Sequence, residues 1–469
     1  MHCLIRVLYG GLIMLKGFLF KKIEMWAVLV LAVVGIIGSL LFGGAVRNYY
    51  SMGGSKLGNL GPVVESIAAF PSVVRDVMAL GMSDKHALAT QRHFKGSSGF
   101  QFNYAAGGRP DLGYVLVNRY DGDLRYSVSE LWDLNNQDNV HTWRFADVDT
   151  IWEESTLKSR LADMAVDFAT KRFRNMHALL SDSGRIYTVR GLLITADVCS
   201  SLAILEGSAF YHHSLERDHQ GNFWAPQYIE PKTVTIGRDF FRDDGITLIS
   251  PDGDILFKKS VIQLLDDNGM GYLVYGTGKY NSRNNNDPIH LNDIQPVLQD
   301  GEFWQKGDVF LSIRNLSMVL LYRPSTNEVL WHRRGPWLHQ HDVDILNDHQ
   351  ISIYNNNINL DSHVYGVAGV NNMLVYDFRT HRVTAPWRAG FEKLQVRTVT
   401  EGLGEVVGDE VFVEETNHGR LIQFAPDGMV SWQYINRAAD GDIYRVNWSR
   451  LVSRKLGDRV RSVVSPGAC

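Results

Sequence analysis

From residue 112 onward, apolar and polar positions alternate in short runs, and Gly, Asp and Asn separate the runs. A period of two is typical of a strand with one buried face, and these turn residues end strands. One hairpin-like unit recurs, in which a polar turn leads into β-branched or aliphatic residues and often a Trp. Its copies span residues 133–143, 250–258, 323–332, 377–387 and 425–434. The pattern therefore predicts an all-β domain built from repeated hairpins.

A second hairpin unit alternates with the first along the chain. Its copies span residues 211–227, 290–315, 339–356 and 401–416, and each has the pattern of strand, polar turn, strand. One copy of each unit makes about four strands, which is the strand count of a propeller blade. Residues 112–450 hold five or six such repeats, so we expect an all-β fold with a six-bladed β-propeller. A single β-sandwich is the alternative architecture.

Two segments outside this pattern predict helices. In residues 152–180 apolar positions recur every three or four residues, which indicates one amphipathic helix inserted into the β scaffold. Residues 71–80 begin with Pro and fit a short helix. We assign residues 1–24 to a cytoplasmic N-terminal segment, 25–46 to a transmembrane anchor, 47–110 to a juxtamembrane connector, 111–451 to the propeller and 452–469 to a C-terminal tail.

Residues 25–46 contain no charged side chain and are long enough to cross a bilayer. Lys21 and Lys22 precede them. The positive-inside rule therefore puts the N-terminus of a single-pass protein in the cytoplasm and the propeller in the periplasm or outside the cell. A cleaved signal peptide is the alternative, because residues 42–45 supply the small side chains of a cleavage site. The apolar run is long for a signal peptide, which favours the anchor.

The composition changes this picture little. A net charge of −4 and a pI near 6.5 do not indicate a nucleic-acid partner, which usually requires a basic patch. The three cysteines, Cys3, Cys199 and Cys469, lack zinc-site spacing. Cys199 and Cys469 could form a disulfide in an oxidising compartment, although the sequence slightly favours two free thiols.

The second hairpin unit carries the candidate chemistry. Histidine opens three of its four copies, as His212–His213, His290, and the pair His339 and His341. The fourth copy has Glu401 in this place, and Arg314 lies on the second strand of the His290 copy. The first strand of each propeller blade lines the central channel. We therefore expect imidazoles from three blades to meet in one axial pocket, with Arg314 turned toward it.

Such a pocket suits the transfer of an anionic group. Neutral imidazole is a nucleophile near neutral pH, and Arg matches sulfate or phosphate oxygens with a rigid fork of donors. A structural role is the alternative for any single histidine, and a zinc or copper site is the alternative for the cluster. No carboxylate or Cys recurs at a companion position, so we expect neither a metal nor a cofactor. The motifs of phosphate-binding loops, serine hydrolases and zinc proteases are also missing from the sequence.

Residues 211–226, 290–335 and 340–346 resemble the arylsulfotransferase family, and the stretch from Ser312 to Trp331 is the most specific part. The resemblance covers roughly residues 110–450. It implies enzymes that do not use the nucleotide donor PAPS, that work in the periplasm or are secreted, and that have a six-bladed propeller. It also implies ping-pong transfer of a sulfuryl group, in which a phenolic sulfate ester sulfates a histidine and a second phenol accepts the group.

The resemblance assigns roles residue by residue. The sulfated histidine of the family lies in a Gln-His motif, which matches Gln340-His341. The other active-site residues match His290, Arg314 and one of the pair His212 and His213, of which we choose His213. His339 and His212 remain alternative catalytic residues.

Two further functions stay open at this point. One is a non-catalytic, membrane-anchored propeller that binds an anionic ligand or a partner protein. The other is a metal-dependent hydrolase of sulfate or phosphate esters.

Overall fold

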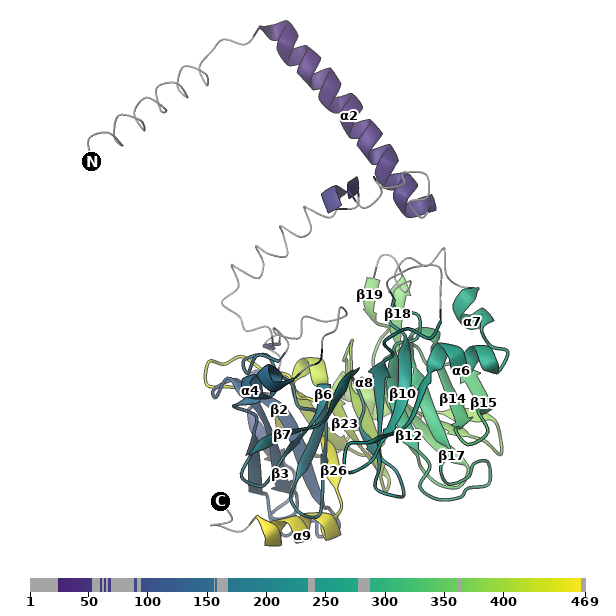
Figure 1. Ribbon diagram of the computed structural model, residues 1–469. Helices are drawn as coiled ribbons and strands as arrows, with labels where there is room; N and C mark the ends of the chain where they lie inside the picture. The colour runs from purple at the N-terminus through teal and green to yellow at the C-terminus, as the bar shows by residue number, and fades with distance from the viewer. Residues whose placement is uncertain are drawn as a thin grey trace, which may run out of the picture. The chain divides into compact units, whose positions relative to one another are not determined.

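The computed structural model describes residues 24–52, 60, 63–64, 66–68, 88–90, 94–155, 157, 168–234, 241–276, 287–361 and 364–464. The chain divides into two units, Met1–Lys85 and His86–Cys469. In the first unit, helix α2 (Met25–Met52) is the main described element (Figure 1). Residues Met25–Arg47 have a mean hydropathy of 2.6 and are long and apolar enough to cross a membrane. The helix expected at residues 71–80 lies outside the described residues.

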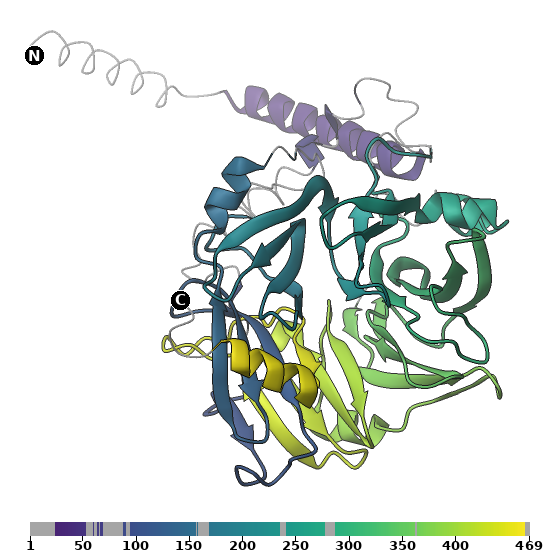
Figure 2. The ribbon, with the colours of Figure 1, turned by 60° about the horizontal axis from the view of Figure 1, so that its bottom comes forward.

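The second unit is built mainly of antiparallel strands, which Figure 2 shows as several sheets around a common centre. One sheet joins β26 (Arg450–Val452), β2 (Tyr114–Asp121), β3 (Tyr126–Asp133) and β4 (Asp138–Arg144). Another joins β12 (Leu291–Pro296), β13 (Val309–Ile313), β14 (Met318–Arg323) and β15 (Glu328–Arg334). A third joins β16 (Val343–Ile345), β17 (Gln350–Asn355), β20 (Asn372–Asp377) and β21 (Arg382–Thr384).

The remaining strands form two larger sheets and a hairpin. A five-stranded sheet joins β22 (Leu403–Val407), β23 (Glu410–Glu415), β24 (Arg420–Phe424), β25 (Val430–Ile435) and β1 (Gly99–Phe102). A seven-stranded sheet contains β5 (Met176–Leu180), β6 (Ile186–Ala196), β7 (Leu202–Tyr211), β8 (Glu216–Arg217), β9 (Phe223–Tyr228), β10 (Asp244–Ile249) and β11 (Ile255–Ser260). The separate hairpin is β18 (Ile358–Asp361) and β19 (Val364–Val367).

The propeller-like, all-β architecture is confirmed, but four separate sheets of blade size stand where we expected six. The other strands are joined because the end of β7 pairs with the end of β9, at Phe210↔Tyr228 and Tyr211↔Gln227. This pairing links residues 176–260 into a single sheet.

The predicted hairpins are confirmed in both units of the repeat. The first unit forms β3–β4, β10–β11, β14–β15, β20–β21 and β24–β25, and the second forms β8–β9, β12–β13, β16–β17 and β22–β23. Local turn chemistry explains why the pattern was readable. Asp133 Oδ1 accepts hydrogen bonds from the backbone N–H groups of Asn135 (3.0 Å) and Asn136 (3.1 Å), and Gly253 supplies a φ of 96° between β10 and β11.

The single inserted helix expected at residues 152–180 is wrong at both described ends, and residues 158–167 of this segment lie outside the described residues. Helix α4 (Val148–Glu154) ends early, and Met176–Leu180 is strand β5, which pairs with β6. Ala178 and Leu180 are buried in the core between this sheet and the β2–β4 sheet. Apolar residues at 176, 178 and 180 fit a period of two as well as a helical face, and pairing with β6 decides between them.

Two segments outside the expected propeller also contribute to its fold. Strand β1 lies within residues 47–110, yet it pairs with β25, so part of the expected connector belongs to a sheet. Helix α9 (Arg454–Val463) lies within the expected tail, and its Val460 is fully buried. Cys199 is disulfide-bonded, so the expectation of a free thiol is wrong for this residue. The partner cysteine lies outside the described residues.

Trp143 shows how neighbouring sheets pack together. Its side chain is fully buried on β4, and its indole N–H donates to the carbonyl of Gly184 at 3.0 Å. Gly184 lies in the turn between β5 and β6, and the surrounding core takes residues from both sheets. Trp143 therefore packs one sheet against its neighbour.

Candidate functional site

A backbone feature repeats at the inner edge of the propeller. Six non-glycine residues there have a positive φ: His177 (48°), His213 (56°), His290 (52°), His339 (53°), Glu401 (62°) and Trp448 (68°). They lie at or just before the starts of β5, β8, β12, β16, β22 and β26. Left-handed backbone costs a non-glycine residue about 1–3 kcal/mol and is concentrated at functional sites. The repeat therefore marks one end of the inner strands as a candidate site.

Four residues predicted from the sequence come together at this end. The rings of His213 and His290 contact each other with centroids 5.0 Å apart. The backbone N–H of Arg314 donates to the carbonyl of His290 at 3.1 Å. The Arg314 charge lowers the pKa of His341, and His341 and His290 are also electrostatic neighbours of His213. Three separate sheets thus contribute to one cluster of histidines beside Arg314.

His341 is fixed through both ring nitrogens. Its Nδ1 lies 2.7 Å from Oδ1 of Asn356, and the backbone N–H of Glu401 donates to its Nε2 at 2.9 Å. Because Asn356 Oδ1 only accepts, Nδ1 carries the proton and Nε2 carries the lone pair. Burial lowers the pKa of His341 to about 3, and Arg314 lowers it in the same direction. His341 is therefore a neutral imidazole near pH 7.

His339 lies close to Arg314 and His290, and it is 7% exposed. Burial lowers its pKa to about 4, and the charges of Arg314 and His290 act in the same direction. Among the described residues, its Nδ1 has no hydrogen-bond partner. The structure thus brings His339 beside Arg314, as it does His341, but no described residue holds its Nδ1 by a hydrogen bond.

His212 lies behind His213 rather than beside the other histidines. The two Nδ1 atoms are 2.7 Å apart, and His212 Nε2 lies 3.1 Å from Oδ1 of Asp244. If the Nε2 proton of His212 faces Asp244, its Nδ1 accepts the proton of His213 Nδ1. With the protons placed in this way, the lone pair of His213 lies on its Nε2. Burial, followed by the charge of His212, lowers the pKa of His213 well below the ordinary value.

His290 has a carboxylate partner of its own. Its Nδ1 lies 2.5 Å from Oδ2 of Asp287, which also accepts from Arg242 at 3.2 Å. Burial alone would raise the pKa of Asp287, but the hydrogen bond to His290 and the charges of His290 and Arg242 bring it down to about 2. Asp287 is therefore ionised, and it can balance a proton taken up at Nε2 of His290.

Besides the carboxylates Asp287 and Asp244, sequence reasoning missed Asn356, His177 and Arg174. Asn356 is fully buried, but it lies in an Asn-rich stretch that resembles a surface loop. His177 is also fully buried, and its ring lies against Trp448. It was missed because its segment has helical spacing. Arg174 forms an ion pair with Glu401 at 2.7 Å. The sequence hinted at this residue only through Glu401, which occupies a repeat position where the other copies have histidine.

A layer of carboxyl groups lies farther along the inner strands. Burial raises the pKa of Asp293 and of Glu405 to about 7, and it raises the pKa of Asp344 well above the usual value. Arg450 donates to Glu216 at 2.6 Å in this layer. Within the described part of the chain, no group of three His, Cys, Asp or Glu side chains has the arrangement of a metal site.

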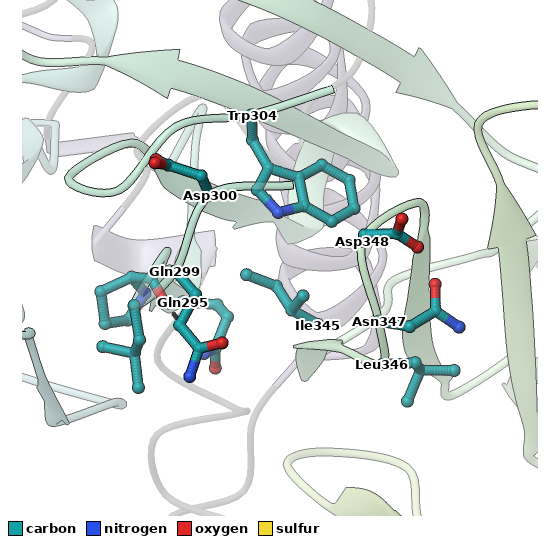
Figure 3. Close-up of a pocket in the computed structure, with 10 residues that line it drawn as sticks. Gln295, Gln299, Asp300, Trp304, Ile345, Leu346, Asn347 and Asp348 are labelled. Atoms are coloured by element: carbon teal, nitrogen blue, oxygen red, sulfur yellow. Dashed lines mark hydrogen bonds between the residues drawn. The ribbon is translucent and has the colours of Figure 1, made fainter. Parts of the chain in front are cut away.

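A cavity of about 330 Å³ lies at the other end of the same strands (Figure 3). Its lining includes Gln295 and Pro296 at the end of β12, Ile345 at the end of β16, and Trp304. The histidines precede the starts of these strands. This cavity therefore contains none of the predicted site residues.

Comparison with protein families finds one match. A model described as "Arylsulfotransferase (ASST)" matches residues 175–437, which is more than half of the chain. These residues include His213, His290, Arg314 and His341. No curated protein matches the chain.

Solved structures with a similar fold share little sequence with this chain. A protein of unknown function from Bacteroides caccae is 10% identical, with 72% of this chain and 97% of that chain covered and a TM-score of 0.42. TolB from Acinetobacter baumannii is 9% identical, with 72% and 65% covered and a TM-score of 0.39. The WD40 β-propeller domain of Doa1 is 8% identical, with 75% and 94% covered and a TM-score of 0.37. Scores this low support no statement about function.

Proposed function

Because the chain belongs to the arylsulfotransferase family, we propose that it moves a sulfuryl group from a phenolic sulfate ester to a phenolic acceptor through a sulfohistidine at His341. One observation supports the proposal: His341, Arg314, His290 and His213 lie in one cluster, in which burial keeps the imidazoles of His341 and His213 neutral. A neutral imidazole supplies the lone pair for attack, and a fixed guanidinium stabilises the charge on the sulfuryl oxygens.

The first half-reaction forms a bond between His341 Nε2 and sulfur. The sulfur–oxygen bond to the donor phenol breaks, and the phenolate leaves with that electron pair. Attack requires Nε2 to give up the hydrogen bond from the backbone N–H of Glu401. That N–H then becomes available to donate to a sulfuryl oxygen. Asn356 keeps the proton on Nδ1 throughout, so the same lone pair is presented in every cycle.

The second half-reaction reverses the bond changes with a new phenol. The acceptor hydroxyl gives its proton to Nε2 of His290, its oxygen attacks sulfur, and the nitrogen–sulfur bond returns its electron pair to His341. His290 is assigned this role because Asp287 balances the proton that it takes up. When the donor phenolate leaves in the next cycle, His290 returns the proton to it. His213 stands beside His290 as a neutral group whose Nδ1 is held by His212.

His339 is the competing nucleophile. Its Nδ1 lacks a partner among the described residues, so it could attack without first breaking a hydrogen bond. The backbone N–H that meets His341 Nε2 favours His341, because this donor also stabilises the product. Separate Ala substitutions at His339 and His341 distinguish the two assignments.

The finer structural assignments rest on the same repeat. Six residues with left-handed backbone at or near the starts of six inner strands support six blades, with β5–β7 and β8–β11 as two blades joined at β7 and β9.

The apolar helix α2 and the disulfide at Cys199 support a propeller that is anchored outside the cytoplasm, since disulfides persist in oxidising compartments.

A chromogenic assay tests the proposal. The full-length protein in detergent is mixed with 4-nitrophenyl sulfate and an excess of phenol, and released nitrophenolate is measured together with phenyl sulfate. Parent protein should produce the two in equal amounts, and His341→Ala should lose at least about 1000-fold in turnover. A His341→Ala variant that is as fast as the parent contradicts the assignment. Nitrophenolate without phenyl sulfate indicates a hydrolase, and no turnover by the parent indicates a binding protein.

A further inference from the structure

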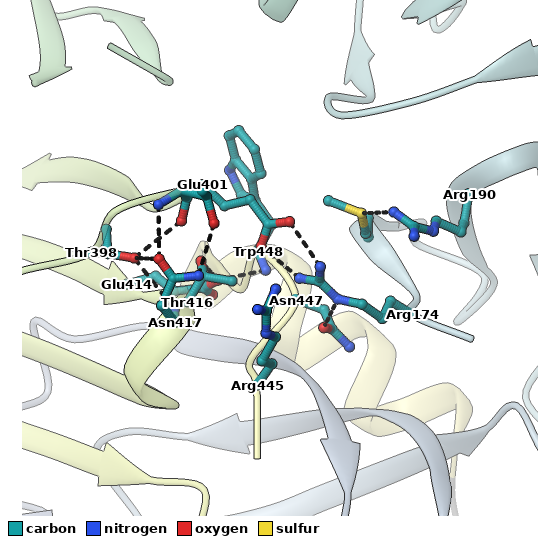
Figure 4. Close-up of polar contacts among 12 residues, drawn as sticks. Arg174, Arg190, Thr398, Glu401, Glu414, Thr416, Asn417, Arg445, Asn447 and Trp448 are labelled. Atoms are coloured by element: carbon teal, nitrogen blue, oxygen red, sulfur yellow. Dashed lines mark hydrogen bonds and ion pairs between the residues drawn. The ribbon is translucent and has the colours of Figure 1, made fainter. Parts of the chain in front are cut away.

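Three arginines act on the charge of Glu401: Arg174, Arg190 and Arg445, here called the arginine cluster (Figure 4). Arg174 donates to the two carboxylate oxygens of Glu401 at 2.8 and 2.7 Å, and its Nε donates to Asn447 at 2.9 Å. Among the described residues, Glu401 is also the carboxylate whose charge acts on Arg445. Arg445 therefore shares one carboxylate with Arg174, which already holds both of its oxygens.

The electrostatics of Glu401 confirm that all three arginines are close to it. Burial would raise the pKa of Glu401, but Arg174, Arg445 and Arg190 together bring it to about 2. For Arg445 the balance is the opposite. Burial and the charge of Arg174 lower the pKa of Arg445. The charge of Glu401 raises it, but by less. Arginine stays protonated despite such a shift, so the Arg445 charge is under-compensated.

The Arg445 side chain is positioned to meet a further group. Within the described part of the chain it donates no hydrogen bond, and Figure 4 shows it beside the hydrogen-bonded pair of Glu401 and Arg174. Arg190 lies across from it on β6, where Nη1 contacts the sulfur of Met176 at 3.5 Å. Arg445, Arg190 and the Glu401 side chain (15% exposed) are all partly open to solvent. A ligand can thus reach the cluster.

The cluster is joined to the reacting nitrogen through a single residue. Glu401 holds Arg174 with its side chain and donates its backbone N–H to His341 Nε2. A molecule whose reacting oxygen lies at His341 would therefore hold its other end near Arg445 and Arg190. Guanidinium groups pair best with planar carboxylates and with sulfate or phosphate oxygens.

We infer that the arginine cluster is an anion subsite for the acceptor, and that the preferred acceptors are phenols that carry a carboxylate or a similar acidic group on the ring. This inference rests on the proposed transfer reaction and adds the class of its acceptor. Arg445 and Arg190 bind the acidic group, while Arg174 keeps Glu401 in place. The neutral ring and its hydroxyl then extend toward His341 and His290.

The test compares two acceptors in the full-length protein, 4-hydroxybenzoate and its methyl ester, with 4-nitrophenyl sulfate as donor. The ratio of their kcat/KM values is measured for the parent, Arg445→Gln, Arg445→Lys and Arg382→Gln. Differences in intrinsic reactivity cancel when this ratio is compared between proteins. Arg445→Gln should lower the ratio about 10-fold or more, and Arg445→Lys should restore part of it. Arg382 is exposed on the outer strand β21, and its Gln variant should keep the parent ratio.

A binding measurement separates this inference from the transfer reaction itself. Calorimetric titration with 4-hydroxybenzoate, without any donor, should give a Kd that is about 10-fold weaker for Arg445→Gln than for the parent. If the parent transfers no sulfuryl group to either acceptor, the transfer proposal fails and this titration alone decides the subsite. An unchanged acceptor ratio, or equal binding by parent and Arg445→Gln, overturns the inference. Thermal unfolding of each variant shows that the comparison is made on folded protein, and Arg190→Gln replaces Arg445→Gln if the latter does not fold.

Discussion

The backbone N–H of Glu401 lies 2.9 Å from Nε2 of His341, so the nitrogen assigned to attack sulfur is already hydrogen-bonded to the chain. The relationship has two consequences. It aligns the lone pair of a buried imidazole, and it supplies a donor at the place where a sulfuryl oxygen would lie after transfer. Asn356 completes the arrangement from the other side of the ring.

The first prediction concerns the tautomer of His341. Asn356→Ala removes the acceptor for the Nδ1 proton, so the imidazole can place its proton on Nε2 instead. We expect turnover with 4-nitrophenyl sulfate to fall about 10- to 100-fold, while thermal stability changes less than turnover does. Asn347→Ala, in the exposed β16–β17 turn, is the matched control and should be as active as the parent. Equal activity of the two variants would show that Asn356 does not orient the nucleophile.

The second prediction concerns the shape of the Arg314 side chain. Arg314→Lys keeps the positive charge but loses the planar fork that can donate to two sulfuryl oxygens. We expect kcat/KM for the donor to fall about 10-fold or more. Arg382→Lys changes an exposed arginine on β21 in the same way and should have no effect. If Arg314→Lys is as active as the parent, Arg314 acts only as a point charge, or it does not touch the substrate.

The hairpins were predictable because their signals are local. Alternation and turn residues such as Asp133 and Gly253 act within a few positions of one another. The seven-stranded sheet was not predictable, because the pairing of Phe210 with Tyr228 joins residues across a whole hairpin. The helix expected at residues 152–180 failed for a related reason, since pairing with β6 outweighed a periodicity that two structures could share.

The histidines could be predicted because they recur at matching positions of the repeat. Their hydrogen-bond partners could not be predicted, because those residues do not recur. His213, His290 and His339 stand in matching places of the repeat, with His341 two residues farther on, and a propeller brings such places to one axis. Asn356, Asp287 and Asp244 have no counterpart at matching positions, so only the folded chain brings them to the rings. His177 was hidden because its segment was assigned to a helix.

The third prediction concerns stability and pH. Burial raises the pKa of Asp293, Glu405 and Glu414 to about 7, so between their ordinary values and about 7 the folded chain holds more protons than the unfolded chain. Their stabilising effect is present in acid and is lost as the pH rises. Glu401 and Asp287 have lowered pKa values and act in the opposite direction only near their own ordinary values, in more acidic solution. These carboxyls therefore lower the free energy of unfolding between about pH 5 and about pH 8, while the buried histidines with lowered pKa values, among them His341 and His213, act in the opposite direction up to about pH 6.5.

Asp293→Asn tests this directly. The variant removes one titrating carboxyl from the buried layer and keeps its size. Its free energy of unfolding, measured by denaturant titration across the same pH range, should fall less steeply than that of the parent, by on the order of 1 kcal/mol or more. Asp252→Asn changes an exposed turn residue and should follow the parent curve. Parallel curves for the parent and Asp293→Asn would mean that Asp293 does not carry the extra proton.

The central claim is that His341 becomes covalently sulfated. Its most direct test is to mix the protein with 4-nitrophenyl sulfate in the absence of any phenolic acceptor, quench, digest and map the added mass by peptide fragmentation. The account predicts one sulfuryl group on the imidazole of His341, and its disappearance when a phenol is added before the quench. A sulfuryl group on His339 instead, or an unlabelled protein that still forms the aryl sulfate product, would contradict it.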